Sequence, residues 1–373
     1  MVISMRIEPE KGILNKGNWY RLKRVMRKAQ SGEEITVGFL GGSITQGCLS
    51  STPETCYAYL VYEWWMKKFP DTKVNYVNAG IGGTTSQFGV ARADKDLLRF
   101  DIDFSVVEFS VNDVNNDHFQ ETYEGLIRKL YGSKTAPALL IVNSVQYNDG
   151  VNAEEKHNEV GKHYQIPCVS MKPTIYAKVE RGEIKNTDIT PDDLHPNDAG
   201  HALMAEVIIC FLEQVYADLA NEADKEYEMP VPMTKNAYEN SVRYQNNEAY
   251  PINRGFDSDE TPQNDIREIF RNGWTASEKG ASITFMVEGT CLAVQYRKSV
   301  VQPTPIAKAV IDGKEKEAVI LDGNFEETWG DSLHLETIAE HIAGGLHEVK
   351  IEIIETHEDD KVPFYLTSII ASK

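Results

Sequence analysis

Three polar residues in two separated stretches have the side chains that acyl transfer needs. Ser43 follows two glycines in VGFLGGSITQG (37–47), where an apolar run ends, and Asp192 precedes His195 by three residues in TPDDLHPNDAG. A serine hydroxyl is a weak nucleophile until a base removes its proton, and imidazole titrates near neutral pH. A carboxylate so close to the histidine could hold the ring's tautomer and stabilise the imidazolium. The pattern predicts a nucleophile, a base and an orienting acid.

Acyl transfer also needs hydrogen-bond donors where negative charge develops on the carbonyl oxygen. The candidate donors are the backbone amides of Ser43 and Gly83 and the side-chain NH2 of Asn112. Gly83 lies in the stretch NAGIGGTTS, and Asn112 lies in the stretch SVND. Each stretch alone is ordinary turn chemistry. Together they supply the remaining parts of an acyl-transfer site.

Neighbouring residues offer rival assignments. Asp193 adjoins Asp192, but the D-x-x-H spacing favours Asp192, and extended backbone would turn Asp193 to the other side. Asp113 follows Asn112, and we expect it to hydrogen-bond locally rather than to react. The rival bases outside a block with a paired acid are His118, His157, His163 and His201. His201 falls on a predicted helix, which favours a packing role.

The elements that position these residues alternate along the first part of the chain. Apolar runs predict strands at 35–40, 74–80, 104–111, 138–145 and 166–171. Helical spacing predicts helices at 17–31, 57–69, 121–132 and 199–220. Strands separated by helices imply an α/β fold whose parallel sheet is covered on both faces. Ligands bind beyond the carboxyl ends of such strands, where the serine, glycine and asparagine stretches are expected.

The later part of the chain has a different pattern. At 373 residues, two domains are expected. After about residue 222 the sequence is polar and contains prolines, and from about residue 265 short alternating runs and Asp-Gly turns predict an antiparallel sandwich. We therefore predict a catalytic domain at 1–225, followed by a linker and an all-β sandwich at 226–373.

Charge and cysteine usage narrow the classes of partner. A net charge of −19 disfavours nucleic acid and anionic membranes, but a neutral sugar is compatible with it. The N-terminus lacks the apolar core of a secretory signal, so we expect a soluble, cytoplasmic protein. The five cysteines are scattered without a CxxC pair, which favours reduced thiols over disulfides or a zinc site. The oligomeric state stays open, a homo-oligomer included.

The four stretches resemble the sequence blocks of the SGNH (GDSL-type) hydrolases. The blocks read GGSIT, NAGIGG, SVND and DDLHPND, in the family's order, within a match over roughly 30–220. The resemblance implies a flavodoxin-like three-layer α/β/α fold and ester hydrolysis without a metal or cofactor. It also implies a role for each site residue: Ser43 as nucleophile, Asp192 as acid, His195 as base, and Ser43, Gly83 and Asn112 as oxyanion donors.

Two positions depart from the family pattern. Gly42 stands where the GDS block has aspartate, as in several branches of carbohydrate esterases, and Ser110 replaces the usual first glycine of the third block. Neither departure removes a group that the chemistry needs.

The predicted β-domain is similar to carbohydrate-binding modules of the family 35 type, and two tryptophans bear on this resemblance. Trp274 and Trp329 adjoin glycines in polar surroundings, where an exposed ring could stack on a sugar. A tryptophan near a strand end also commonly fills the core of a sandwich, so both roles stay open for each residue. The acidic neighbours of Trp329 favour exposure for that ring.

A GGSIT-type hydrolase followed by a β-module looks most like the acetyl-mannan esterases of carbohydrate esterase family 17. This resemblance implies removal of 2-O-acetyl groups from mannose units of imported oligosaccharides, with the β-module bending over the active site to hold the chain. One alternative is an esterase of another class, such as a lysophospholipase or thioesterase, although no lid rich in Leu and Phe is evident. The other alternative is a non-catalytic sugar-binding protein.

Overall fold

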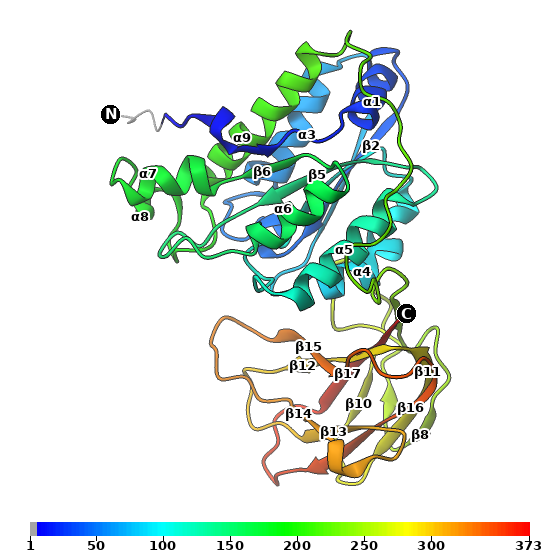
Figure 1. Ribbon diagram of the computed structural model, residues 1–373. Helices are drawn as coiled ribbons and strands as arrows, with labels where there is room; N and C mark the ends of the chain where they lie inside the picture. The colour runs from blue at the N-terminus through cyan, green and yellow to red at the C-terminus, as the bar shows by residue number, and fades with distance from the viewer. Residues whose placement is uncertain (1–5) are drawn as a thin grey trace. The chain divides into compact units, whose positions relative to one another are not determined.

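The computed structural model describes residues 6–373 and divides the chain into two domains, with the boundary between Asn236 and Ala237 (Figure 1). This boundary lies later than the predicted one after residue 225. The segment before it packs on the first domain: the backbone amides of Met233 and Thr234 donate to the buried carboxylate of Glu124, 2.7 and 2.9 Å away. The polar composition of this segment concealed these contacts.

A six-stranded sheet forms the centre of the described part of the first domain, in the order β1-β6-β5-β4-β2-β3. The strands are β1 (Ile13–Asn15), β2 (Ile35–Gly41), β3 (Val74–Gly80), β4 (Phe104–Glu108), β5 (Ala138–Asn143) and β6 (Cys168–Ser170). β2 to β6 are parallel, and the short β1, which the sequence did not predict, pairs antiparallel with β6. The chain goes from β2 to β3 on one side and then to β4 on the other. The switch point between β2 and β4 is where such sheets bind ligands.

Helices cover both faces of this sheet (Figure 1). On one face lie α1 (Tyr20–Gln30), α3 (Tyr57–Lys68) and α9 (Asp198–Ala217), and on the other α4 (Ser86–Asp96), α5 (Asp117–Tyr131) and α6 (Glu154–His163). The short helices are α2 (Ser43–Gln46), α7 (Ala177–Glu180), α8 (Asn186–Ile189) and single turns at Pro9–Gly12, Pro53–Thr55, Leu98–Phe100 and Lys172–Tyr176. The predicted three-layer α/β/α fold is confirmed. The prediction missed α4 and α6.

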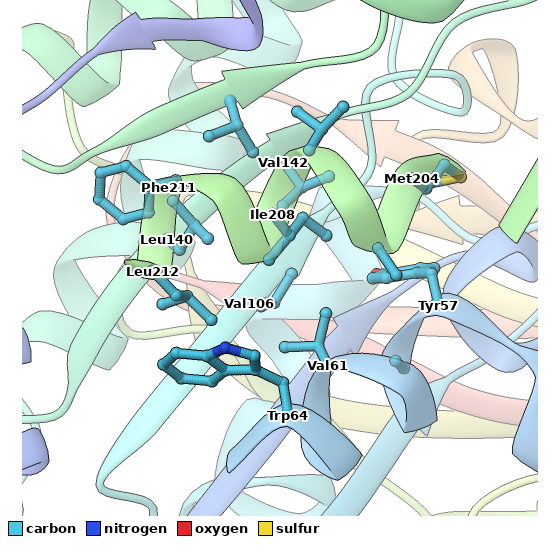
Figure 2. Packing of buried hydrophobic residues seen from close by; sticks show 14 of the residues in the cluster. Tyr57, Val61, Trp64, Val106, Leu140, Val142, Met204, Ile208, Phe211 and Leu212 are labelled. Atoms are coloured by element: carbon cyan, nitrogen blue, oxygen red, sulfur yellow. The ribbon is translucent and has the colours of Figure 1, made fainter. Parts of the chain in front are cut away.

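The most apolar helix, α9, belongs to the core. It is long and apolar enough to cross a membrane by length and composition alone, but Figure 2 shows its residues Met204, Ile208, Phe211 and Leu212 facing strand residues and α3. All four side chains are fully buried. Packing between the sheet and α3 therefore accounts for the apolar composition of α9.

The second domain is a sandwich of two antiparallel sheets. One sheet has the order β15-β12-β17-β10-β9, with β7 also paired to β17, and the other has the order β14-β13-β16-β11-β8. The strands are β7 (Val242–Tyr244), β8 (Ile252–Arg254), β9 (Asp257–Ser258), β10 (Trp274–Ala276), β11 (Ser282–Gly289), β12 (Cys291–Lys298), β13 (Ile306–Ile311), β14 (Val319–Asp322), β15 (Ser332–Ala339), β16 (Gly345–Glu355) and β17 (Phe364–Ser372), with one turn at Glu315–Glu317. Alternate residues of β11 are buried, which confirms the predicted sandwich.

The two tryptophans of this domain have different environments. Trp274 is 2% exposed and packs edge-on against Phe285 within the core, with ring centroids 5.2 Å apart. Of the two roles that the sequence left open for Trp274, the structure therefore shows the core role, and the buried ring offers no face for a sugar. Trp329 lies in the loop between β14 and β15 and is 62% exposed, with its ring edge-on to Phe325.

Candidate active site

Ser43 begins α2 directly after β2, at the switch point of the sheet. Two glycines allow α2 to pack closely on the strand ends. A Cβ on Gly41 would lie 2.2 Å from the Thr45 hydroxyl oxygen, and a Cβ on Gly80 would lie 2.1 Å from the backbone nitrogen of Gln46. No other residue fits at either position without displacing α2, so these glycines set the place of the Ser43 side chain.

Ser43, His195 and Asp192 form a continuous hydrogen-bonded series. The Ser43 Oγ lies 2.8 Å from His195 Nε2, and His195 Nδ1 lies 2.6 Å from Asp192 Oδ2. The structure therefore brings together the three residues that the sequence predicted, although Ser43 and His195 are 152 positions apart. With a proton on Nδ1 shared with the carboxylate, Nε2 is free to accept the serine proton.

The second oxygen of Asp192 is held by the loop itself. Asp192 Oδ1 accepts hydrogen bonds from the backbone amides of Leu194 and His195, at 3.1 and 2.7 Å, and from the Thr190 hydroxyl at 3.2 Å. Partial burial opposes ionisation of Asp192, but the hydrogen bonds from the His195 ring and the two amides outweigh it and lower the pKa of the carboxyl group. Asp192 is thus fixed as a carboxylate pointing at the imidazole.

Asp193 differs from the expectation in its backbone. Its φ of 64° is left-handed rather than extended, and its carbonyl accepts from the Tyr147 amide at 2.7 Å. Its side chain accepts a hydrogen bond from Asn186. The assignment of Asp192 as the partner of His195 from the D-x-x-H spacing holds, but the second reason given for it was wrong, because the backbone at Asp193 is left-handed and not extended.

The loop after β3 lies beside Ser43. A Cβ on Gly82 would lie 3.6 Å from the Ser43 Cβ, which places this loop against the nucleophile. The Gly82 amide donates to the side-chain oxygen of Gln46 at 2.7 Å, whereas the next residue, Gly83, has a left-handed φ of 67°. Glycine adopts this conformation without strain. The geometry is compatible with the predicted role of the Gly83 amide.

Asn112 approaches from the loop after β4. Its side-chain oxygen is buried, and a Cβ on Gly42 would lie 2.3 Å from that oxygen. That oxygen has no hydrogen-bond partner among the described residues, and the role of the NH2 group as a donor stays a prediction. A side chain at position 42 would therefore crowd the Asn112 side chain as it lies here. The Ser43 amide, the first of α2, has no partner within the helix.

Ser110, the second departure from the family pattern, has a structural role. Its hydroxyl donates to the buried Glu108 carboxyl at 3.3 Å or to the Ser144 carbonyl at 3.0 Å. Burial raises the pKa of Glu108 to about 7. Ser110 thus fills polar space below the Asn112 loop, between β4 and β5.

The segment between α2 and α3 is tied to the start of α9. Asp198 accepts from Ser51 and Thr55, and these bonds lower its pKa to about 2. His201 accepts from the Tyr57 amide at Nδ1 and donates from Nε2 to the Cys48 carbonyl, both at 3.3 Å. This pairing requires a neutral ring, and burial lowers the pKa of His201 to about 4. His201 therefore packs, as predicted, and is no rival base.

Two supporting residues escaped the sequence analysis. Asn78 donates to the Thr45 carbonyl at 2.8 Å and accepts from the Gly80 amide at 2.9 Å, so it joins α2 to the end of β3. Thr190 supports Asp192 as described. Asn78 opens the second block and could have been suspected, whereas a threonine two residues before an aspartate carries no signal of its own.

All five cysteines are free thiols, as expected. In residues 6–373, no group of three or more His, Cys, Asp and Glu side chains could hold a metal ion.

Comparisons with known proteins agree with this geometry. Residues 39–203 match the GDSL-like lipase/acylhydrolase family. A solved structure described as a two-domain esterase (CEX) active on acetylated mannans is 56% identical, with 99% of each chain covered and a TM-score of 0.97. The chain belongs to the GDSL-like lipase/acylhydrolase family. The predicted resemblance is thereby confirmed, and the protein is a GDSL-like hydrolase with an appended all-β domain.

A second structure of similar description was obtained by co-crystallisation with mannopentaose. That esterase, co-crystallised with the oligosaccharide, is 55% identical to this GDSL-like hydrolase, covers 99% of this chain and 98% of its own, and has a TM-score of 0.95. The comparison with curated proteins found no match.

The adjacent aspartates provide a matched test of the acid. Asp192→Asn should lower kcat roughly 10³- to 10⁴-fold, because an amide donor facing Nδ1 favours the tautomer that cannot accept the serine proton. Asp193→Asn should leave kcat close to the wild-type value. Steady-state hydrolysis of 4-nitrophenyl acetate measures both. Equal losses in the two variants would contradict the assignment.

Protonation of His201 should lower the free energy of unfolding in acid. Its folded pKa of about 4 lies below the ordinary value of 6.5, so the unfolded chain takes up a proton first as the pH falls. The free energy of unfolding should decline between those values, by ~2 kcal/mol at pH 5 from this group. Urea unfolding of the first domain at pH 7 and pH 5 should show a smaller decline for His201→Gln. An identical decline in the variant would be evidence against this role.

Proposed function

We propose that this protein is a serine esterase that removes acetyl groups from mannan-derived oligosaccharides, and in particular 2-O-acetyl groups. The observation that carries the proposal is the 56% identity, over 99% of the chain, to an esterase active on acetylated mannans. The hydrogen-bonded series of Ser43, His195 and Asp192 supports it, because these residues are the nucleophile, base and acid that serine ester hydrolysis uses.

The first half of the reaction acylates Ser43. Its Oγ attacks the acetyl carbonyl carbon while His195 Nε2 takes the hydroxyl proton, and Asp192 stabilises the resulting imidazolium. The negative charge that develops on the carbonyl oxygen is met by the amides of Ser43 and Gly83 and the NH2 of Asn112. The C–O bond to the sugar then breaks, and His195 returns the proton to the leaving sugar oxygen.

The second half releases acetate. Water attacks the acetyl–Ser43 ester while His195 takes its proton, and a second oxyanion forms at the same donors. The bond to Ser43 Oγ then breaks, and the proton returns from His195 to the serine. The cycle yields acetate and a sugar hydroxyl and restores the hydrogen-bonded series of the free enzyme.

Two further observations support a carbohydrate substrate. The esterase co-crystallised with mannopentaose is 55% identical to this chain, so an oligosaccharide ligand suits the shared fold. The exposed Trp329 ring offers a flat apolar surface in the all-β domain. We propose that this domain acts as a carbohydrate-binding module and that Trp329 stacks on a sugar ring.

Acetate release tests the substrate and the position together. Wild-type protein incubated with acetylated mannooligosaccharides should release acetate with loss of the 2-O-acetyl signals in the proton NMR spectrum. Ser43→Ala should lower kcat by orders of magnitude while the oligosaccharide still binds. Unchanged 2-O-acetyl signals, alongside hydrolysis of other acetyl positions, would rule out the positional assignment. A preference for long acyl chains over acetyl would instead favour a lysophospholipase or thioesterase.

Trp329 can be tested against another exposed aromatic residue of the same domain. Trp329→Ala should raise KM for acetylated mannooligosaccharides about fivefold, as expected for ~1 kcal/mol of ring contact, and leave KM for 4-nitrophenyl acetate unchanged. Tyr250, which is 97% exposed, provides the control, and Tyr250→Ala should change neither constant. A Trp329→Ala variant with wild-type KM for the oligosaccharide would remove this residue from the binding site.

A further inference from the structure

A second carboxylate–imidazole pair lies inside the first domain, apart from the Ser43 series. Asp113 Oδ2 lies 3.0 Å from His157 Nε2, and both side chains are completely buried. The His157 ring stacks on Tyr123 of α5, with ring centroids 3.6 Å apart and planes 10° from parallel. His157 is thus held between α5 and its own helix, α6, and gives Asp113 a rigid partner.

The other oxygen of Asp113 reaches the loop that carries Gly83. Asp113 Oδ1 accepts the Ser86 backbone amide at 2.9 Å. Ser86 is the first residue of α4, three residues after Gly83, and Asp113 directly follows Asn112. One buried carboxylate therefore joins the two loops that supply the Gly83 and Asn112 oxyanion donors.

The Asn112 loop has a further connection to α6. The amide of Ala153, the residue before α6, donates to the Ser110 carbonyl at 2.7 Å. Within the loop, the amides of Asn112 and Asp113 both donate to the Phe109 carbonyl. The turn at 109–113 is therefore closed by its own backbone, and the Asp113 side chain anchors it to α4 and α6.

We propose that Asp113 and His157 are a positioning pair that fixes the oxyanion donors of Asn112 and Gly83 relative to each other. The inference rests on the proposed esterase function, since the donors matter only if an oxyanion forms. Neither residue is proposed to touch the substrate.

The physical reason for such a pair lies in the tolerance of the oxyanion hole. Donors are effective when they lie about 2.7–3.1 Å from the developing oxyanion, and a misplacement of about 1 Å can lower the rate about 100-fold. A buried carboxylate that has lost a partner is costly, so Asp113 keeps both of its bonds and holds both loops. Because the oxyanion exists only on the reaction path, looser donors should lower kcat and leave KM unchanged.

Asp113→Asn tests the pair with the small substrate 4-nitrophenyl acetate. The amide oxygen can still accept from Ser86, but a neutral amide replaces the carboxylate that His157 Nε2 contacts. We expect kcat to fall about 10- to 100-fold with KM within about twofold of the wild type. An unchanged kcat in the folded variant, or a change confined to KM, would overturn the proposal.

A double-mutant cycle with Asn112→Ala shows whether Asp113 acts through Asn112. In the Asn112→Ala background, Asp113→Asn should lower kcat clearly less than it does in the wild type, since one of the two donors that it positions is already absent. The same loss in both backgrounds would overturn the proposal, because it would mean that Asp113 acts independently of Asn112.

Two further sets of variants separate positioning from loss of stability. Val215→Ala in the core part of α9 should lower the melting temperature and leave kcat unchanged, which shows that destabilisation alone does not reproduce the effect. His157→Gln retains a donor for Asp113, and His157→Leu does not. We therefore expect kcat to stay close to the wild-type value in His157→Gln and to fall in His157→Leu. Equal kcat in the two His157 variants would contradict the proposed pair. This test remains valid if Asp113→Asn does not fold.

Different outcomes would contradict the proposed function and the proposed positioning pair. A wild-type protein that hydrolyses no ester contradicts the esterase proposal itself. Activity of the wild type on 4-nitrophenyl acetate together with full kcat in Asp113→Asn contradicts the positioning pair alone.

Discussion

The close approach of α2 to the ends of β2 and β3 is the constraint on which the site depends. Gly41 and Gly80 leave no room for a side chain between these strands and the helix, and Asn78 fastens the two together. Ser43 consequently lies at the switch point of the sheet, between the ends of β2 and β4. The base and the acid lie in a loop that reaches Ser43, and the predicted oxyanion donors lie in the loops after β3 and β4.

Much of this arrangement could be predicted from the sequence because the reacting residues lie in ordered blocks. Ser43, Asp192 and His195 were assigned correctly as hydrogen-bonded partners, and the alternation of apolar runs with helical periods was enough to predict the three-layer fold. The sandwich followed from short alternating strands. These signals are local: each is carried by neighbouring residues, with spacing that the backbone geometry imposes.

The features that were missed depend on contacts between distant segments. The observed domain boundary, at Asn236, lies later than the predicted one because the segment before it binds Glu124. Glu124 lies in α5, far from this segment in the sequence. The sequence left two roles open for Trp274, and its polar neighbours gave no sign that it fills the sandwich core. α4 is almost wholly buried and includes Arg92 and Asp96, so it shows no clear alternation of apolar and polar faces. The link from Asp113 to Ser86 and His157 likewise has no pattern in the sequence.

The acid and base of the site share one short loop, and the loop itself supplies the bonds that hold Asp192 in place. Thr190, Leu194 and His195 supply the donors for one oxygen of Asp192, and the other oxygen meets the imidazole. The loop therefore holds the Asp192–His195 pair together by its own hydrogen bonds. A shift of its backbone changes the separation of Ser43 and His195 but leaves the His195–Asp192 geometry intact, so evolution can adjust the reach of the base without rebuilding its electrostatic partner.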